Sequence, residues 1–252
     1  MITSKANDFI KEIRSLHDKK GRDELGLYIA TGEKLVKTAT EFGCSFHALI
    51  VSESEVDYAK KYSDIKFSSG AKGVVEVSNE VFKSISGEVS PQGVLAVLNK
   101  PQTLPKNDSN AILLDGVADP TNVGAILRTA LASNYTEIYL TEGSADPFSP
   151  KSVRASMGGV FGVNIHFIKK EECDKIGMPI IVADMKGENA FKFKSPKRFC
   201  LCIGNEGNGV SERVKGIAKY TVSIPMENGM ESLNASVSAG ILMYALKENK
   251  EL

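Results

Sequence analysis

Short, continuous apolar runs in the second half of this 252-residue sequence constrain its fold more than any other feature. The runs lie at 111–115, 137–140, 163–167, 180–183, 199–203 and 220–224. Continuous runs, unlike runs that alternate with polar residues, are typical of parallel strands covered on both faces. Helical segments are expected at 123–133 and 233–248. The second half is therefore expected to form an α/β domain with a mostly parallel sheet.

The first of these strands leads into a polar turn and a helix. The chain reads LDGVADPTNVGAILRTA over 114–130. Asn122 is the expected N-cap of the helix, and Arg128 follows further along it. Ligands of open α/β sheets bind outside the carboxyl ends of the strands, so both residues are candidates for a site. Taken alone, this stretch is explained more simply by a capping asparagine and a surface arginine.

Two later strands lead into similar turns. The sequence IGNEGNGV at 203–210 places Glu206 among three glycines and is neither a dinucleotide fingerprint nor a P-loop. Glu206 is open to two interpretations, a solvated turn residue or a functional carboxylate. In the third turn, Asn228 and Gly229 predict a reversal. Small polar residues then crowd the start of the last helix, where Ser232 is a plausible N-cap.

The first half predicts a separate, smaller α/β domain over 1–98, followed by a proline-containing linker at 99–109. Apolar residues recur at helical spacing between Phe9 and Leu16. Further strands and helices alternate along the domain. The strands are expected at 27–30, 46–51, 73–77 and 94–98, and the helices at 33–42 and 55–62.

Charge and composition narrow the class of protein. The formal net charge is zero, although residues 1–22 are locally basic. Lys19, Lys20 and Arg22 are candidate phosphate contacts, with a solvated helix face as the alternative. No signal peptide or membrane-spanning run is visible, so a cytoplasmic protein is expected. The scattered cysteines and histidines predict no metal site, and Cys200 and Cys202 are expected to be buried free thiols.

The three turns together resemble a known family. The segments NVGAILRT at 122–129, IGNEGNGV at 203–210 and IPM…ESLNASV within 224–237 resemble, in this order, the three motifs of the SpoU (TrmH-like) RNA 2′-O-ribose methyltransferases. The resemblance covers about residues 110–252. More loosely, the first hundred residues resemble the family's RNA substrate-binding domain, which is related to ribosomal protein L30e.

This resemblance implies a fold and an activity. The domain at 110–252 would be a knotted SPOUT methyltransferase domain with a trefoil knot. The protein would be a homodimer with its active site near the subunit boundary. S-adenosylmethionine would be the cofactor, with no metal required, and RNA the substrate. Many relatives carry glycine where this chain has Asn228, a change that asparagine's tolerance of left-handed backbone softens.

The resemblance also assigns residues. Backbone groups of Gly204, Ile224 and Leu233 would bind the cofactor, with Met226 lining the pocket. The reacting site would consist of Asn122, Arg128, Glu206, Ser232 and Asn234. Because a guanidinium stays protonated at ordinary pH, we expect Arg128 to act as a cation that stabilises charge on the 2′-oxygen, and not as a base.

Alternatives remain for the substrate and for the class of protein. Ribosomal RNA is the first expectation, and transfer RNA is the alternative. A non-catalytic RNA-binding dimer would retain the fold but has no need of Arg128 or of the pair Ser232 and Asn234. An ordinary Rossmann-type enzyme ranks last, because its glycine-rich turn follows the first strand and here the turn follows a late one.

Overall fold

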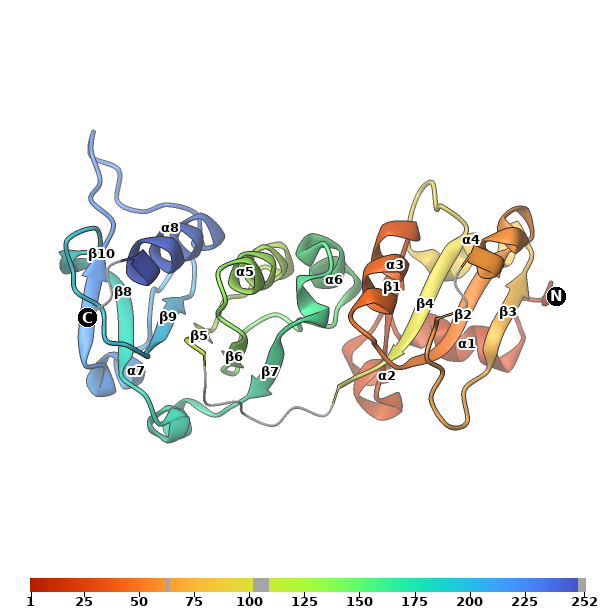
Figure 1. The fold of residues 1–252 in the computed structure, drawn as a ribbon, viewed down its shortest axis with the longest axis horizontal. Helices are drawn as coiled ribbons and strands as arrows, with labels where there is room; N and C mark the ends of the chain where they lie inside the picture. The colour runs from red at the N-terminus through yellow and green to blue at the C-terminus, as the bar shows by residue number, and fades with distance from the viewer. Residues whose placement is uncertain (62–63, 102–108, 249–252) are drawn as a thin grey trace. The chain divides into compact units, whose positions relative to one another are not determined.

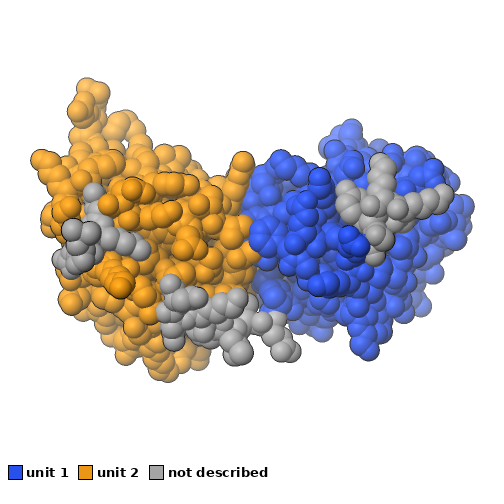
Figure 2. Space-filling view, viewed as in Figure 1, with its two compact units in different colours: residues 1–102, 148–161 blue, residues 103–147, 162–252 orange. Residues whose placement is uncertain are grey.

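The computed structural model describes residues 1–61, 64–101 and 109–248, and the chain divides into two compact units (Figures 1 and 2). Unit 1 comprises residues 1–102 and 148–161, and unit 2 comprises residues 103–147 and 162–252. Most of the expected linker lies outside the described residues. The domain boundaries at 98 and 110 stay predictions, whereas the grouping of 148–161 with unit 1 is a feature that the sequence did not indicate.

Unit 1 contains a four-stranded sheet in the order β1-β4-β2-β3. β4 pairs antiparallel with β1 and β2, and β2 pairs parallel with β3. The strands are β1 (Leu27–Thr31), β2 (Phe46–Ser52), β3 (Gly73–Val77) and β4 (Val94–Asn99), close to the ranges expected from the sequence. The core packs Ile10, Ile13 and Leu16 of the first helical region against this sheet, as their spacing predicts.

Helices surround this sheet. They are α1 (Asp8–Ser15), α2 (Lys19–Leu25), α3 (Glu33–Glu41), η1 (Glu53–Lys61), α4 (Asn79–Ser86), α6 (Pro150–Ser156) and η2 (Gly159–Phe161). The helix expected at 55–62 is a 3₁₀ segment that starts earlier and is kinked at Glu55, and residue 62 lies outside the described residues. α6 packs against β1, which explains why this segment groups with unit 1.

Unit 2 is built on a six-stranded sheet in the order β10-β8-β9-β5-β6-β7, and every pairing in it is parallel. The strands are β5 (Ala111–Asp115), β6 (Glu137–Leu140), β7 (Asn164–Phe167), β8 (Ile180–Asn189), β9 (Cys200–Gly204) and β10 (Tyr220–Ser223). The expected parallel sheet is therefore confirmed. The trefoil knot that the resemblance implies stays a prediction.

Helices cover both faces of the parallel sheet (Figure 1). α5 (Pro120–Ala132) and α8 (Ala235–Glu248) pack against each other on one face. On the other face, η3 (Lys170–Ile176) and α7 (Glu212–Ile217) enclose an apolar cluster. That cluster contains the free thiols of Cys173, Cys200 and Cys202, so the expectation of buried free thiols on β9 is confirmed.

Two expected helix caps were wrong. α5 begins at Pro120, and its N-cap is Asp119, whose carboxylate accepts a hydrogen bond from the Thr121 amide at 2.8 Å. Proline is well suited to the first helical position, because its missing N–H would have no helical partner there. Asn122 therefore lies inside the first turn of α5. α8 begins at Ala235, and Asn234, not Ser232, accepts the hydrogen bonds from the first amides.

None of the described helices is long and apolar enough to cross a bilayer.

The close approach of β8 and β10 at Gly187 yields a stability prediction. A Cβ added there would lie 2.4 Å from the Val222 carbonyl carbon, whereas one added at Gly216 on α7 would meet nothing within 4 Å. We expect Gly187→Ala to lower the free energy of unfolding by about 1–3 kcal/mol, as overpacking does. Gly216→Ala should be neutral or stabilising, because alanine favours a helix. Urea unfolding measures both, and equal stabilities of the two variants would contradict this account of Gly187.

Candidate functional site

The turns that follow β5, β9 and β10 meet at the carboxyl edge of the parallel sheet. The turns after β9 and β10 border a cavity of about 620 Å³. It is lined by residues 203–209, 222–224, 226 and 231–235, and residues 183–185 of β8 close one side. The expected location of a ligand site in an open parallel sheet is therefore where the cavity lies.

Glu206 is held by donors from the turn after β5. Its carboxylate accepts a hydrogen bond from the Asn122 Nδ2 at 2.9 Å, and from the amides of Ala118 at 3.2 Å and Asp119 at 3.4 Å. Partial burial opposes ionisation of Glu206, but these donors and its own amide outweigh the burial and lower its pKa. Glu206 is thus an ionised, orienting carboxylate and a weak base.

Asn122 connects Glu206 to the third turn. It is 6% exposed, and its Oδ1 accepts a hydrogen bond from the Asn234 Nδ2 at 3.0 Å. Asn234 in turn accepts hydrogen bonds from the amide of Ser236 at 2.9 Å and of Val237 at 3.3 Å through its Oδ1. A single chain of hydrogen bonds, from Glu206 through Asn122 to Asn234, therefore joins all three turns.

The glycine-rich turn is closed by its own backbone. Asn205 and Gly209 exchange two amide–carbonyl hydrogen bonds of 2.9 and 3.0 Å. A Cβ on Gly204 would lie 2.2 Å from the Gly209 carbonyl carbon, so the absence of a side chain at Gly204 is required for the turn itself. Beyond β10, Asn228 and Gly229 both have left-handed backbone, with φ of 55° and 72°, which confirms the expected reversal.

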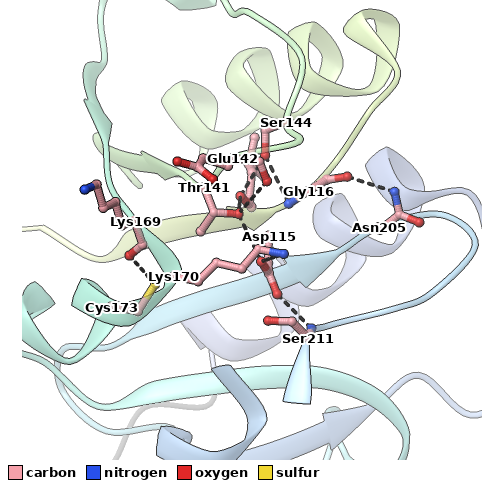
Figure 3. Close-up of polar contacts among 11 residues, drawn as sticks. Asp115, Gly116, Thr141, Glu142, Ser144, Lys169, Lys170, Cys173, Asn205 and Ser211 are labelled. Atoms are coloured by element: carbon pink, nitrogen blue, oxygen red, sulfur yellow. Dashed lines mark hydrogen bonds and ion pairs between the residues drawn. The ribbon is translucent and has the colours of Figure 1, made fainter. Parts of the chain in front are cut away.

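Asp115, at the end of β5, was missed by sequence reasoning. It is 2% exposed, and it accepts hydrogen bonds from the Ser211 amide at 2.7 Å and the Thr141 hydroxyl at 3.0 Å (Figure 3). The Lys170 Nζ lies 3.5 Å from its Oδ1. Burial opposes its ionisation, but the contacts with Ser211, Thr141 and Lys170 prevail and lower its pKa. A carboxylate ending an otherwise apolar strand was the signal that could have found it.

Asp115 helps to hold the same glycine-rich turn that contains Glu206. Ser211, its partner, directly follows the glycine-rich turn and precedes α7. At the other end of the turn, the Asn205 Nδ2 donates to the Gly116 carbonyl oxygen at 2.9 Å (Figure 3). The turn after β9 is thus tied at both ends to the chain that leaves β5.

The candidate cofactor residues lie together. Gly204, Ile224, Met226 and Leu233 all line the cavity, as do Glu206, Ser232 and Asn234. Leu233 is 37% exposed, so part of its side chain is open to solvent. The hydroxyl of Ser232 makes no hydrogen bond within the described part of the chain.

Arg128 is not brought to this cavity within one chain. It is exposed on α5, it does not line the cavity, and it makes no hydrogen bond or ion pair with the residues that the structure describes. Of the expected reacting group, Asn122, Glu206, Ser232 and Asn234 gather at or beside the cavity, and Arg128 does not.

The basic residues of unit 1 differ from one another. Lys19 and Lys20 are exposed and form ion pairs one helical turn away, with Asp23 and Glu24. Arg22 is 3% exposed, and its Nη1 donates to the carbonyl oxygens of Leu16 at 2.8 Å and His17 at 2.9 Å. The guanidinium of Arg22 is therefore buried and bonded to the backbone, and it is not exposed for contact with a phosphate.

A parallel α/β sheet with a cavity at the carboxyl edge of its strands defines a class of ligand-binding folds. The model of the SpoU rRNA Methylase family matches residues 109–244, and that of the MRM3-like substrate binding domain matches residues 7–96. The chain therefore belongs to the SpoU rRNA methylase family.

Named relatives are similar to this protein over nearly its whole length. The chain is 28% identical to the 23S rRNA (guanosine(2553)-2′-O)-methyltransferase RlmP of Bacillus subtilis, covering 98% of each protein. An AdoMet-bound rRNA methyltransferase from Sinorhizobium meliloti is 29% identical, with a TM-score of 0.85 over 98% of this chain and 97% of that one. A putative TrmH-family RNA methyltransferase from Porphyromonas gingivalis is 31% identical, with a TM-score of 0.80 over 95% and 96%.

The lowered pKa of Asp115 predicts an acid-sensitive contribution to stability. Because its folded pKa lies below the ordinary 3.8, ionised Asp115 stabilises the fold above about pH 4, and this contribution is lost as the pH falls through the folded value. We expect Asp115→Asn to lower the melting temperature at pH 7, with the difference from wild type shrinking below pH 4. Asp8→Asn, which removes an exposed carboxylate, is the control and should change little. A constant difference across pH would contradict the assignment.

Proposed function

We propose that this protein transfers a methyl group from S-adenosylmethionine to a ribose 2′-hydroxyl of ribosomal RNA. The observation that carries this proposal is the hydrogen-bonded chain Glu206–Asn122–Asn234 beside the cavity, formed by the three motifs of the family. Relatives of nearly full length carry the same activity in their names. We further propose that the protein works in the cytoplasm as a homodimer.

The cavity fits a cofactor of this kind. Its volume of about 620 Å³ lies within the range of about 300–1,000 Å³ for small-molecule sites. The main chain around Gly204, Ile224 and Leu233 would supply amide and carbonyl groups for the edge of an adenine ring, and Met226 would supply apolar contact. When bound, S-adenosylmethionine supplies a methyl group that is already activated by a sulfonium.

The protein's own groups would then position and polarise the ribose. Asn122 and Asn234 have fixed amide orientations, because ionised Glu206 can only accept hydrogen bonds and Asn122 must therefore turn its Nδ2 toward it. The free hydroxyl of Ser232 lines the same cavity and would contact the nucleotide. Glu206 is already engaged by three donors, so it orients these amides and does not remove the 2′-proton.

We assign Arg128 to the active site of a second copy of the chain. It is exposed on α5, beside α8, and α8 itself exposes Val237 and Tyr244, each about half exposed. Apolar residues on an exposed helix favour an isologous interface between two copies. Across that interface, Arg128 would grip the adjacent phosphate and stabilise negative charge developing on the 2′-oxygen.

Arg128 therefore gives the central test. We expect Arg128→Ala to bind S-adenosylmethionine with nearly wild-type affinity in calorimetry, and to transfer methyl groups about 10²–10³ times more slowly in single turnovers. Arg128→Lys should recover little, because it lacks the planar fork. The acceptor is ribosomal RNA, with transfer RNA as a parallel arm, from cells lacking this protein. Wild-type turnover in the alanine variant would remove Arg128 from the mechanism, and methylation of the transfer RNA alone would change the substrate.

A mixture of inactive chains tests the second copy. When Arg128→Ala chains are refolded with Glu206→Gln chains, half of the dimers are mixed, and each has one intact site if Arg128 acts across the interface. We expect about one quarter of wild-type turnover from the mixture. If Arg128 serves the cavity of its own chain, the mixture stays inactive.

Unit 1 would supply RNA affinity. We retain Lys19 and Lys20 as proposed phosphate contacts, because exposed ion pairs cost little to break, and we omit the buried Arg22. We expect the Lys19→Glu, Lys20→Glu double variant to weaken RNA binding and reduce its salt dependence, with unchanged cofactor affinity. Filter binding across salt concentrations measures both quantities. An unchanged salt slope would make this helix a solvated face only.

A further inference from the structure

The edge of the parallel sheet contains a break that no motif explains. β10 pairs with β8 in register at Thr221 and Val182, but the next residue, Val222, lies opposite Glu188. The intervening residues 183–187 of β8 have no partners on β10, and we call them the β8 excursion. Irregularities of this kind often re-aim side chains next to active sites.

The β8 excursion forms one wall of the cavity. Ala183, Asp184 and Met185 line it, opposite the turns after β9 and β10. Gly187 then lets β8 rejoin the sheet against the Val222 backbone, as described above. The Ser223 hydroxyl donates to the Gly187 carbonyl oxygen at 2.9 Å and fixes this return. The excursion is therefore a built part of the cavity.

Asp184 is the carboxylate that the excursion carries into this wall. Its Oδ1 accepts a hydrogen bond from the Lys186 amide at 3.1 Å, and its Oδ2 lies 3.1 Å from the Lys215 Nζ on α7. Its side chain is 28% exposed. The Lys186 amide lowers the pKa of Asp184, burial opposes this, and Lys215 adds to the lowering, so the group is ionised at neutral pH. Each oxygen retains a lone pair for a further donor.

We propose that Asp184 binds the cofactor, accepting hydrogen bonds from the ribose hydroxyls of its adenosyl group, and that Lys215 is the positioning residue that holds Asp184 in place. The inference rests on the proposed function, since it requires S-adenosylmethionine to occupy this cavity. β8 lies between β9 and β10 in the sheet. Asp184 thus stands between the two main-chain segments, at Gly204 and Ile224, that are proposed to hold the adenosine.

The charges around Asp184 favour hydroxyls over an ammonium. Lys215 also lies 3.4 Å from the exposed Glu212, and it lines the cavity together with Asp184. A cation this close to Asp184 repels the cofactor's ammonium and sulfonium groups. Neutral hydroxyls are not repelled, and a carboxylate at the end of a strand that binds ribose hydroxyls is a recurring solution in α/β folds. Of the other carboxylates that line the cavity, Glu206 is already engaged by Asn122 and two amides, and Glu231 is exposed to solvent.

The test is a thermodynamic cycle between protein and ligand, measured by calorimetry without RNA. The probes are S-adenosylhomocysteine, its 2′,3′-dideoxy analogue and 5′-methylthioadenosine, which lacks the amino-acid end. We expect Asp184→Asn to lower the affinity for S-adenosylhomocysteine and for methylthioadenosine about tenfold or more, as loss of a charged hydrogen bond does. The affinity for the dideoxy analogue should not change. Lys215→Met should cause a smaller loss of the same pattern.

Glu212→Gln is the matched control, because it removes the other, exposed partner of Lys215 and should leave all three affinities unchanged. Melting curves verify that each variant is folded. An equal loss for the normal and dideoxy ligands, or a loss confined to the ligand with the amino-acid end, would overturn the ribose assignment, as would unchanged affinities for Asp184→Asn. Failure of the wild-type protein to bind any of the probes would instead overturn the proposed cofactor site itself.

Discussion

The site depends on hydrogen bonds between the two turns that leave the neighbouring strands β5 and β9. Parallel pairing of these strands brings the two turns side by side. Two carboxylates then join them from opposite directions. Asp115 of β5 accepts a hydrogen bond from the amide of Ser211, which follows the glycine-rich turn. Glu206 in that turn accepts hydrogen bonds from the amides of Ala118 and Asp119. Amides in partly buried turns need acceptors, so these carboxylates satisfy the backbone and fix its shape together.

The same contacts fix the orientation of the side-chain amides of Asn122 and Asn234. An ionised carboxylate has no proton to donate, so Asn122 must turn its Nδ2 toward Glu206. Its Oδ1 is then left for the Nδ2 of Asn234, whose own Oδ1 faces the first amides of α8. The orientation of both amides follows from the charge of Glu206, whose pKa is lowered in this setting. Groups ordered in this way meet a ligand without further reorganisation.

The cavity and the reacting groups make different demands on the sequence. Much of the cavity wall comes from turns in which many side chains would serve, provided that the turns keep their shape. Gly204 and Gly187 are exceptions, since a Cβ at either would enter the backbone of a neighbouring strand or turn. The proposed reacting groups, by contrast, depend on particular amides and carboxylates. In the proposed mechanism, a small number of residues therefore sets the chemistry, while the sheet determines where the site lies.

The sequence by itself determined the parallel sheet, the three turns at its carboxyl edge and the small polar residues in them, because apolar runs and turn residues act locally. The resemblance of the turns to the family's motifs also singled out Gly204, Ile224, Met226 and Leu233, all of which line one cavity. Only the tertiary structure decided that Asn122 is no cap but a link between Glu206 and Asn234, residues far from it in the chain. Only the tertiary structure showed that Arg22 is buried, that Asp115 accepts from Ser211 and that β8 makes its excursion from β10. These features depend on which strands become neighbours and in which register, and pairing between distant segments leaves no periodic pattern in the sequence.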